Sequence, residues 1–122
     1  MKRVVVIDDV LSYVEDIEKV AKEAGYDVLA IRIDPKNISN LVEIVTSIAK
    51  FRPNIILIDH NMGEISGDEF AQILGLPKKF FVGTSTVWDS QKDYCARRFP
   101  HKGCTPDEDF KKELLEAIEG VA

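Results

Sequence analysis

Short, almost unbroken hydrophobic runs recur along the chain at residues 4–7, 28–33, 55–58 and 80–82. Such runs, rich in valine and isoleucine, are typical of strands that are buried on both faces of a parallel sheet. Residues 97–99, Arg-Arg-Phe, lack this character and would make only a poor, brief fifth strand. The pattern therefore indicates a covered parallel sheet rather than a half-exposed antiparallel one.

Segments with helical spacing lie between these runs. The first ends at Gly25, a common helix terminator, and the second ends before Pro53. The first predicted stripe consists of Leu11, Val14, Ile17, Ala21 and Ala24. The second consists of Leu41, Val42, Ile44, Val45, Ile48 and Ala49.

Two further helices are predicted from their start signals. Ser66 and Glu69 have the spacing of a capping box, and Phe70, Ile73 and Leu74 follow before Gly75 and Pro77. Thr105, Pro106 and Glu108 suggest a last helix with threonine at the cap and proline in the first turn. Its buried stripe is Phe110, Leu114, Leu115 and Ile118. Residues 89–98 are only weakly helical.

The composition is that of one folded domain spanning residues 1–122. Hydrophobic residues make up 45% and charged residues 30% of the chain, and the net charge is −5. A negative chain without clustered Lys and Arg is not expected to bind nucleic acid. No apolar run reaches the roughly 18 residues that span a bilayer, so we expect a cytoplasmic protein without a membrane segment. Cys95 and Cys104 are expected to be reduced thiols.

Alternating strands and helices predict a doubly wound α/β fold, which binds ligands at the carboxyl ends of its strands. Asp8 and Asp9 follow the first strand, Asp59 the third, Thr84 the fourth and Lys102 the weak fifth. We therefore expect these side chains to meet at one edge of the sheet.

Three neighbouring carboxylates repel one another unless a cation lies among them. Mg²⁺ suits such a site because it prefers carboxylate and carbonyl oxygens and keeps several waters. With a metal ion and Lys102 nearby, Asp59 can act as a nucleophile toward a phosphoryl group. Asp8 and Asp9 are adjacent and suit joint metal binding.

In their order and spacing these residues resemble the receiver domain of bacterial response regulators. The resemblance spans the chain and rests on Asp8-Asp9, on Asp59-His60-Asn61-Met62 leading to Gly67, on Thr84-Ser85 and on Lys102. It implies a flavodoxin-like sheet of five parallel strands. It also implies site roles: Asp59 as phosphoacceptor; Asp8, Asp9, Asp59 and the Asn61 carbonyl as Mg²⁺ ligands; Thr84 and Lys102 as phosphoryl contacts; and Thr84 with Phe99 as the switch.

The chain departs from the family pattern at several positions. Gly103 and Gly63 stand where the family commonly has proline, and Val10 stands where an acidic or small polar residue is usual. Gly103 predicts a looser loop around Lys102. The segment 84–102 is short, whereas the loop 34–37 is extended.

Plainer interpretations exist for each residue. Asp8 and Asp9 could cap the first helix, and Asp59 could simply close a strand. Thr84 could satisfy backbone groups, Lys102 could be a surface lysine, and Phe99 could be an ordinary core residue.

The leading functional hypothesis is a stand-alone receiver without an output domain in a histidine-to-aspartate phosphorelay. It predicts a sensor histidine kinase or a histidine phosphotransfer protein as donor and an unidentified downstream protein as target. Self-phosphorylation and slow dephosphorylation would be its whole chemistry, so it is not expected to be an enzyme in the usual sense. The alternative is a degenerate receiver-fold binding module that works without phosphorylation. A Mg²⁺-dependent phosphatase is disfavoured because Asn61 replaces the second aspartate that such enzymes carry.

Overall fold

The computed structural model describes residues 2–120 and contains a central sheet of five parallel strands. The strands are β1 (Arg3–Asp8), β2 (Asp27–Arg32), β3 (Ile55–Ile58), β4 (Phe81–Gly83) and β5 (Arg97–Arg98). Their order is β2-β1-β3-β4-β5. The predicted doubly wound sheet is therefore confirmed, including the brief fifth strand.

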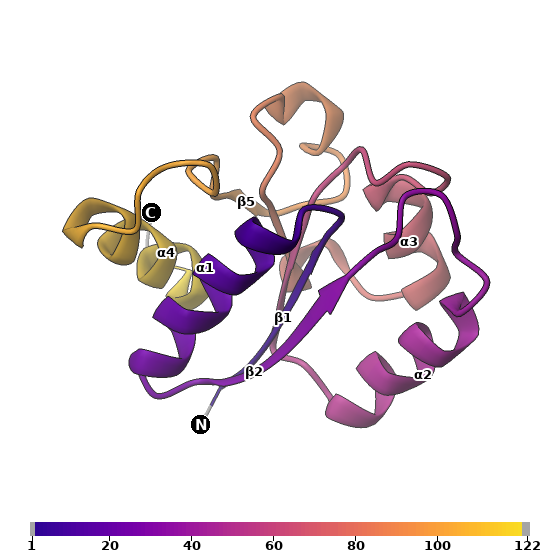
Figure 1. Ribbon diagram of the computed structural model, residues 1–122, viewed down its shortest axis with the longest axis horizontal. Coiled ribbons are helices and arrows are strands. Elements are labelled where there is room, and N and C mark those ends of the chain that lie inside the picture. The colour runs from indigo at the N-terminus through magenta and orange to yellow at the C-terminus, as the bar shows by residue number, and fades with distance from the viewer. Residues whose placement is uncertain (1, 121–122) are drawn as a thin grey trace.

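Four α-helices cover the sheet, two on each face (Figure 1). They are α1 (Leu11–Glu23), α2 (Leu41–Phe51), α3 (Gly67–Leu74) and α4 (Glu108–Glu119). Val4 and Val6 of β1 face the core beneath α1 and α4, while Val5 and Ile7 face the core beneath α2 and α3. Because successive strand residues point to opposite faces, a sheet covered on both sides requires the unbroken hydrophobic runs seen in the sequence.

The predicted helical stripes are only partly buried. Val14, Ile17 and Ala21 of α1 lie in the core, but Leu11 is exposed. In α2 only Ile48 is fully buried, and Val42 is 78% exposed. Ala24, Ala49 and Ile73 are also exposed. The stripes were predicted too wide, because residues about 100° away from the buried line turn toward solvent.

Local start signals succeeded at one helix and failed at another. Ser66 and Glu69 form the predicted capping box at α3, and Gly75 ends that helix with φ of 67°. At α4 the cap is Asp107, whose side chain accepts from the Phe110 N–H, so the prediction of Thr105 at the cap was wrong by two residues. Both residues can cap a helix, and the aspartate lies closer to the first buried residue, Phe110.

Residues between β4 and β5 form no α-helix. Trp88–Ser90 is a short 3₁₀ turn, η2, and turns lead from it to β5. The weak helix considered for residues 89–98 is therefore absent. Another 3₁₀ turn, η1 (Lys78–Phe80), precedes β4, so Phe80, which was predicted to begin the fourth strand, lies just outside β4. Among residues 2–120, no helix combines the length and the apolarity needed to cross a membrane.

Gly63 lies in the loop between β3 and α3, at a position where receiver domains commonly have proline. Glycine is needed there because the loop that precedes α2 packs against it. Its φ is +87°, and a Cβ atom there would lie 2.2 Å from the Pro35 carbonyl oxygen. The same carbonyl accepts a hydrogen bond from the Glu64 N–H at 3.2 Å. The extended loop 34–37 therefore packs directly on the segment that follows Asp59.

Gly63→Ala is expected to destabilise the fold by about 2 kcal/mol more than Gly25→Ala, as measured by urea unfolding. Gly25 is a matched control because its φ is +95° and a Cβ there would meet nothing within 4 Å. Both variants carry the left-handed backbone strain, and only Gly63→Ala adds the collision with Pro35. Equal losses would show that the two loops do not pack in solution.

Candidate phosphoacceptor site

The predicted acidic residues come together at the carboxyl edge of the sheet. Oxygens from Asp8, Asp9 and Asp59 lie within 4.8 Å of one another. Asp8 ends β1 and Asp59 directly follows β3, and these strands are hydrogen-bonded neighbours. Asp8 and Asp59 are buried, whereas Asp9 is partly exposed. The topology therefore produces the carboxylate cluster that the sequence order predicted.

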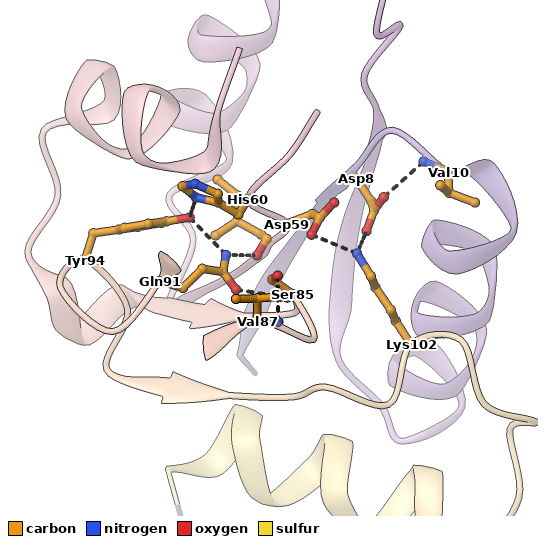
Figure 2. Close-up of polar contacts among 10 residues, drawn as sticks. Asp8, Val10, Asp59, His60, Ser85, Val87, Gln91, Tyr94 and Lys102 are labelled. Atoms are coloured by element: carbon orange, nitrogen blue, oxygen red, sulfur yellow. Dashed lines mark hydrogen bonds and ion pairs between the residues drawn. The ribbon is translucent and has the colours of Figure 1, made fainter. Parts of the chain in front are cut away.

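Lys102 lies between two of these carboxylates (Figure 2). Its Nζ is 2.7 Å from Asp8 Oδ2 and 2.9 Å from Asp59 Oδ1, and the residue is only 7% exposed. The ammonium group also lies 5.2 Å from the centre of the Tyr13 ring. Gly103 therefore does not displace Lys102, and the surface-lysine interpretation is wrong.

The loop that carries Lys102 is anchored to β4 and to α4. The Phe99 N–H donates to the Gly83 carbonyl, and the Phe99 ring packs edge-on against Phe110 with centroids 5.1 Å apart. His101 Nε2 lies 2.5 Å from Glu113 Oε2 on α4. These contacts hold the loop although Gly103, and not proline, follows Lys102. Phe99 is a core residue in this structure, and its switch role remains a prediction.

Two opposing effects set the pKa values in the cluster: burial disfavours each charged form, and the neighbouring opposite charge favours it. Burial raises the pKa of Asp8, although Lys102 and the Val10 N–H favour the carboxylate form. Burial also disfavours the charge on Lys102, but its bonds to Asp8 and Asp59 outweigh this and raise the Lys102 pKa. The lysine therefore stays charged and serves as counter-ion to the carboxylates.

Asp8 has a second local role at the start of α1. Its Oδ1 accepts from the Val10 N–H at 3.0 Å, while Val10, the N-cap residue, makes no side-chain capping bond. Asp8 thus stabilises the turn into α1 with one oxygen and holds Lys102 with the other. The helix-cap interpretation accounts for only one of its two oxygens.

Thr84 places an unpaired hydroxyl in this region. Its N–H donates to the Ile58 carbonyl at 3.0 Å, which fixes it beside the start of the Asp59 loop. Thr84 is 2% exposed, and its Oγ1 is the one buried side-chain oxygen or nitrogen within residues 2–120 without a hydrogen-bond partner. Leaving such a group unpaired costs roughly 1–3 kcal/mol. The hydroxyl is therefore available to an incoming acceptor.

Asn61 lies two residues beyond Asp59 and forms an isolated antiparallel bridge with Ser66. The bridge closes the loop between β3 and α3 and so fixes the Asn61 backbone within that loop. Cys95 is no competing nucleophile, because burial raises the pKa of its thiol to about 12.

Sequence reasoning missed Gln91 and Tyr94. Gln91 is fully buried, and its side chain bonds to the backbone at the ends of β3 and β4. Tyr94 OH lies 3.0 Å from His60 Nδ1, next to Asp59. Neither residue belongs to a motif, and a polar residue in a weakly helical segment gives no signal of burial.

No model of a known protein family matches this sequence. A response regulatory protein of Yersinia pestis, itself described as uncharacterised, is 30% identical over 103 residues, which cover 81% of this chain and 38% of that protein. The chemotaxis response regulator CheY4 of Vibrio cholerae superposes with a TM-score of 0.70 at 20% identity, covering 100% of this chain and 99% of its own. The Mn²⁺-bound form of response regulator Rcp1 superposes with a TM-score of 0.57 at 18% identity, covering 99% of this chain and 91% of its own.

The fold and the sequence relative define the class, a flavodoxin-like receiver domain. This chain has the fold of the response regulator receiver domains and is similar in sequence to a response regulatory protein. It spans about two fifths of the length of the Yersinia pestis relative.

Proposed function

We propose that this chain is the phosphoacceptor of a histidine-to-aspartate relay and takes a phosphoryl group onto Asp59 with the help of Mg²⁺. The observation that carries the proposal is the group around Asp59: two further carboxylates within 4.8 Å and a buried ammonium at 2.9 Å. The donor would be a phosphohistidine of a sensor histidine kinase or of a histidine phosphotransfer protein. We place this relay in the cytoplasm.

The residues present fit a magnesium ion. Asp8, Asp9 and Asp59 supply hard oxygen ligands, and the Asn61 carbonyl is the proposed fourth. When bound, the ion would neutralise charge that develops on the phosphoryl oxygens. The Mn²⁺-bound form of Rcp1, a protein of the same fold, supports a divalent cation in this role.

In the proposed reaction, an Asp59 carboxylate oxygen bonds to phosphorus as the bond from phosphorus to the donor histidine nitrogen breaks. Lys102 already binds Asp59 Oδ1, which fixes the carboxylate and leaves its other oxygen for attack. As the acyl phosphate forms, the ammonium can follow the negative charge onto the phosphoryl oxygens. The Thr84 hydroxyl gains its missing acceptor in the same step.

Signal output requires a surface that differs between the two states. A groove of about 390 Å³ lies between β5 and α4 and is lined by Trp88, Arg98, Phe99, His101 and Glu113, among others. Thr84 and Phe99 are the two ends of the segment 84–99, of which Trp88 and residues 96–99 line the groove. We propose this groove as the face that a downstream protein reads. The chain would act by binding and not as an enzyme on other substrates.

A second candidate is a binding module that no longer runs the phosphorylation cycle. It is favoured by the missing α-helix between β4 and β5 in the described part of the chain. That segment carries the proposed conformational response, so its reduction could leave the module locked in one state.

Beryllofluoride with Mg²⁺ is expected to shift the amide resonances of residues 84–99 as well as those of the loops that carry Asp8, Asp9 and Asp59. The physical reason is the new hydrogen bond from Thr84 to the phosphoryl mimic. Thr84→Ala should suppress the shifts in 84–99 by at least half and leave those of the metal loops. A response confined to the metal loops in the wild-type chain would favour the degenerate module.

A further inference from the structure

A buried side-chain network lies beside Asp59, on the side away from Lys102 (Figure 2). Gln91 is fully buried at its centre. Its Oε1 accepts from the Ser85 N–H at 2.9 Å, and its Nε2 donates to the Ile58 carbonyl at 2.8 Å. Nε2 also donates to the Tyr94 hydroxyl at 3.0 Å. Three hydrogen bonds therefore use both amide protons and the carbonyl oxygen of one side chain.

The position of this amide matters because of what lies on either side. Ile58 immediately precedes Asp59, and Ser85 immediately follows Thr84. The last rung between β3 and β4 is the bond from the Thr84 N–H to the Ile58 carbonyl, at 3.0 Å. The Gln91 amide thus links the ends of β3 and β4 just beyond their last backbone hydrogen bond, where the two chains separate to form the site.

Tyr94 ties the network to the residue after Asp59. Burial raises the pKa of Tyr94, so its hydroxyl keeps its proton. That oxygen accepts from Gln91 and also forms a hydrogen bond with His60 Nδ1, 3.0 Å away. This series of hydrogen bonds reaches Ile58 and His60, the two neighbours of Asp59, and Ser85, the neighbour of Thr84.

Gly83 is shaped to admit the glutamine. A Cβ atom at Gly83 would lie 2.4 Å from Gln91 Oε1. The amide therefore lies directly against the β4 backbone, in space that any other residue would fill. This offers a way to displace Gln91 without changing it.

We propose that Gln91 is a positioning residue for phosphoryl transfer: it joins the ends of β3 and β4 and thereby holds the Thr84 hydroxyl in register with Asp59. This role rests on the proposed phosphoacceptor function. In this role the Gln91 side chain orders the segment between β4 and β5, which contains no α-helix.

The joint itself can be tested without phosphorylation. In the wild-type chain the Ser85 amide and the Gln91 side-chain amide protons should exchange slowly with solvent in NMR measurements, because all are bonded inside the protein. Gln91→Met keeps the length of the side chain and removes every bond, so Ser85 exchange should rise at least tenfold. If the Ser85 amide of the wild-type chain exchanges as fast as that of an open loop, Gln91 does not link β3 to β4 in solution.

The positioning role is tested by phosphorylation kinetics with acetyl phosphate. Gln91→Met should lower the maximal rate about tenfold, as expected for a misplaced catalytic contact, and leave the Mg²⁺ affinity within about twofold. Gly83→Ala should act in the same direction by displacing the amide, which covers the case that Gln91→Met fails to fold. Gln72→Met is the matched control, because Gln72 is exposed on α3 and its side chain donates to Asp68 on the same helix.

A double-variant cycle separates positioning from general support of the fold. If Gln91 acts through Thr84, then Gln91→Met should cause no further loss of rate in a Thr84→Ala background. Additive losses, or unchanged rates in both Gln91→Met and Gly83→Ala, overturn the positioning role while the proposed function stands. A wild-type chain that takes no phosphoryl group overturns both.

Discussion

Lys102→Met is expected to lower the free energy of unfolding by about 4 kcal/mol at neutral pH without divalent cations, measured by urea unfolding. The reason is that Asp8 and Asp59 stay buried while their shared counter-ion is lost. Lys92→Met is the matched control, since that lysine is 53% exposed and pairs with an exposed Asp89 at 3.4 Å. Its loss should stay below about 1 kcal/mol.

The loss in Lys102→Met should depend on Mg²⁺ and on pH. A cation bound by the folded state restores about 2.7 kcal/mol at a concentration 100 times its dissociation constant. Burial raises the pKa of Asp8, so ionised Asp8 already opposes folding at pH values above that raised pKa. The deficit of the variant should therefore be largest at neutral pH and shrink as the pH falls and the carboxyl groups take up protons. A deficit that is independent of both would contradict a charge-based role for Lys102.

Asp59→Asn is expected to abolish incorporation of a phosphoryl group from acetyl phosphate and Mg²⁺, measured by intact mass. The amide has nearly the same shape but cannot act as the nucleophile. Stability should change by less than about 1 kcal/mol, because loss of the ion pair with Lys102 is offset by weaker repulsion among the carboxylates.

Asp89→Asn is a suitable control for that experiment, since its side chain is 87% exposed and lies outside the cluster. It should take up phosphate at the wild-type rate. Incorporation into Asp59→Asn would mean that another residue is the acceptor, and the proposed role of Asp59 would have to be given up.

The contrast between Lys102 and Gln91 shows how far residue patterns reach. Lys102 was predicted because it follows a weak strand in an order that matches a known family, and the structure places it between Asp8 and Asp59. Gln91 lies in a segment without clear periodicity, and its burial depends on the missing side chain of Gly83, eight positions earlier. That kind of complementarity exists only once the chain is folded.

Helix boundaries show the same division on a smaller scale. The Ser66 capping box formed as predicted, because both of its partners lie within one helical turn. Thr105 lost the cap of α4 to Asp107, since the burial of Phe110 against Phe99 sets where that helix begins. A local signal decides a boundary only when no distant contact competes with it.

By itself the sequence determined the covered parallel sheet and the gathering of Asp8, Asp9, Asp59, Thr84 and Lys102 at one edge. Hydrophobic runs and their order are enough for this, since parallel strands must end at the same edge. Only the tertiary structure decided that Lys102 binds two carboxylates at once, that the Thr84 hydroxyl is left unpaired, and that an amide joins β3 to β4. These features depend on distances between side chains from separate strands and loops, which packing sets and spacing along the chain does not.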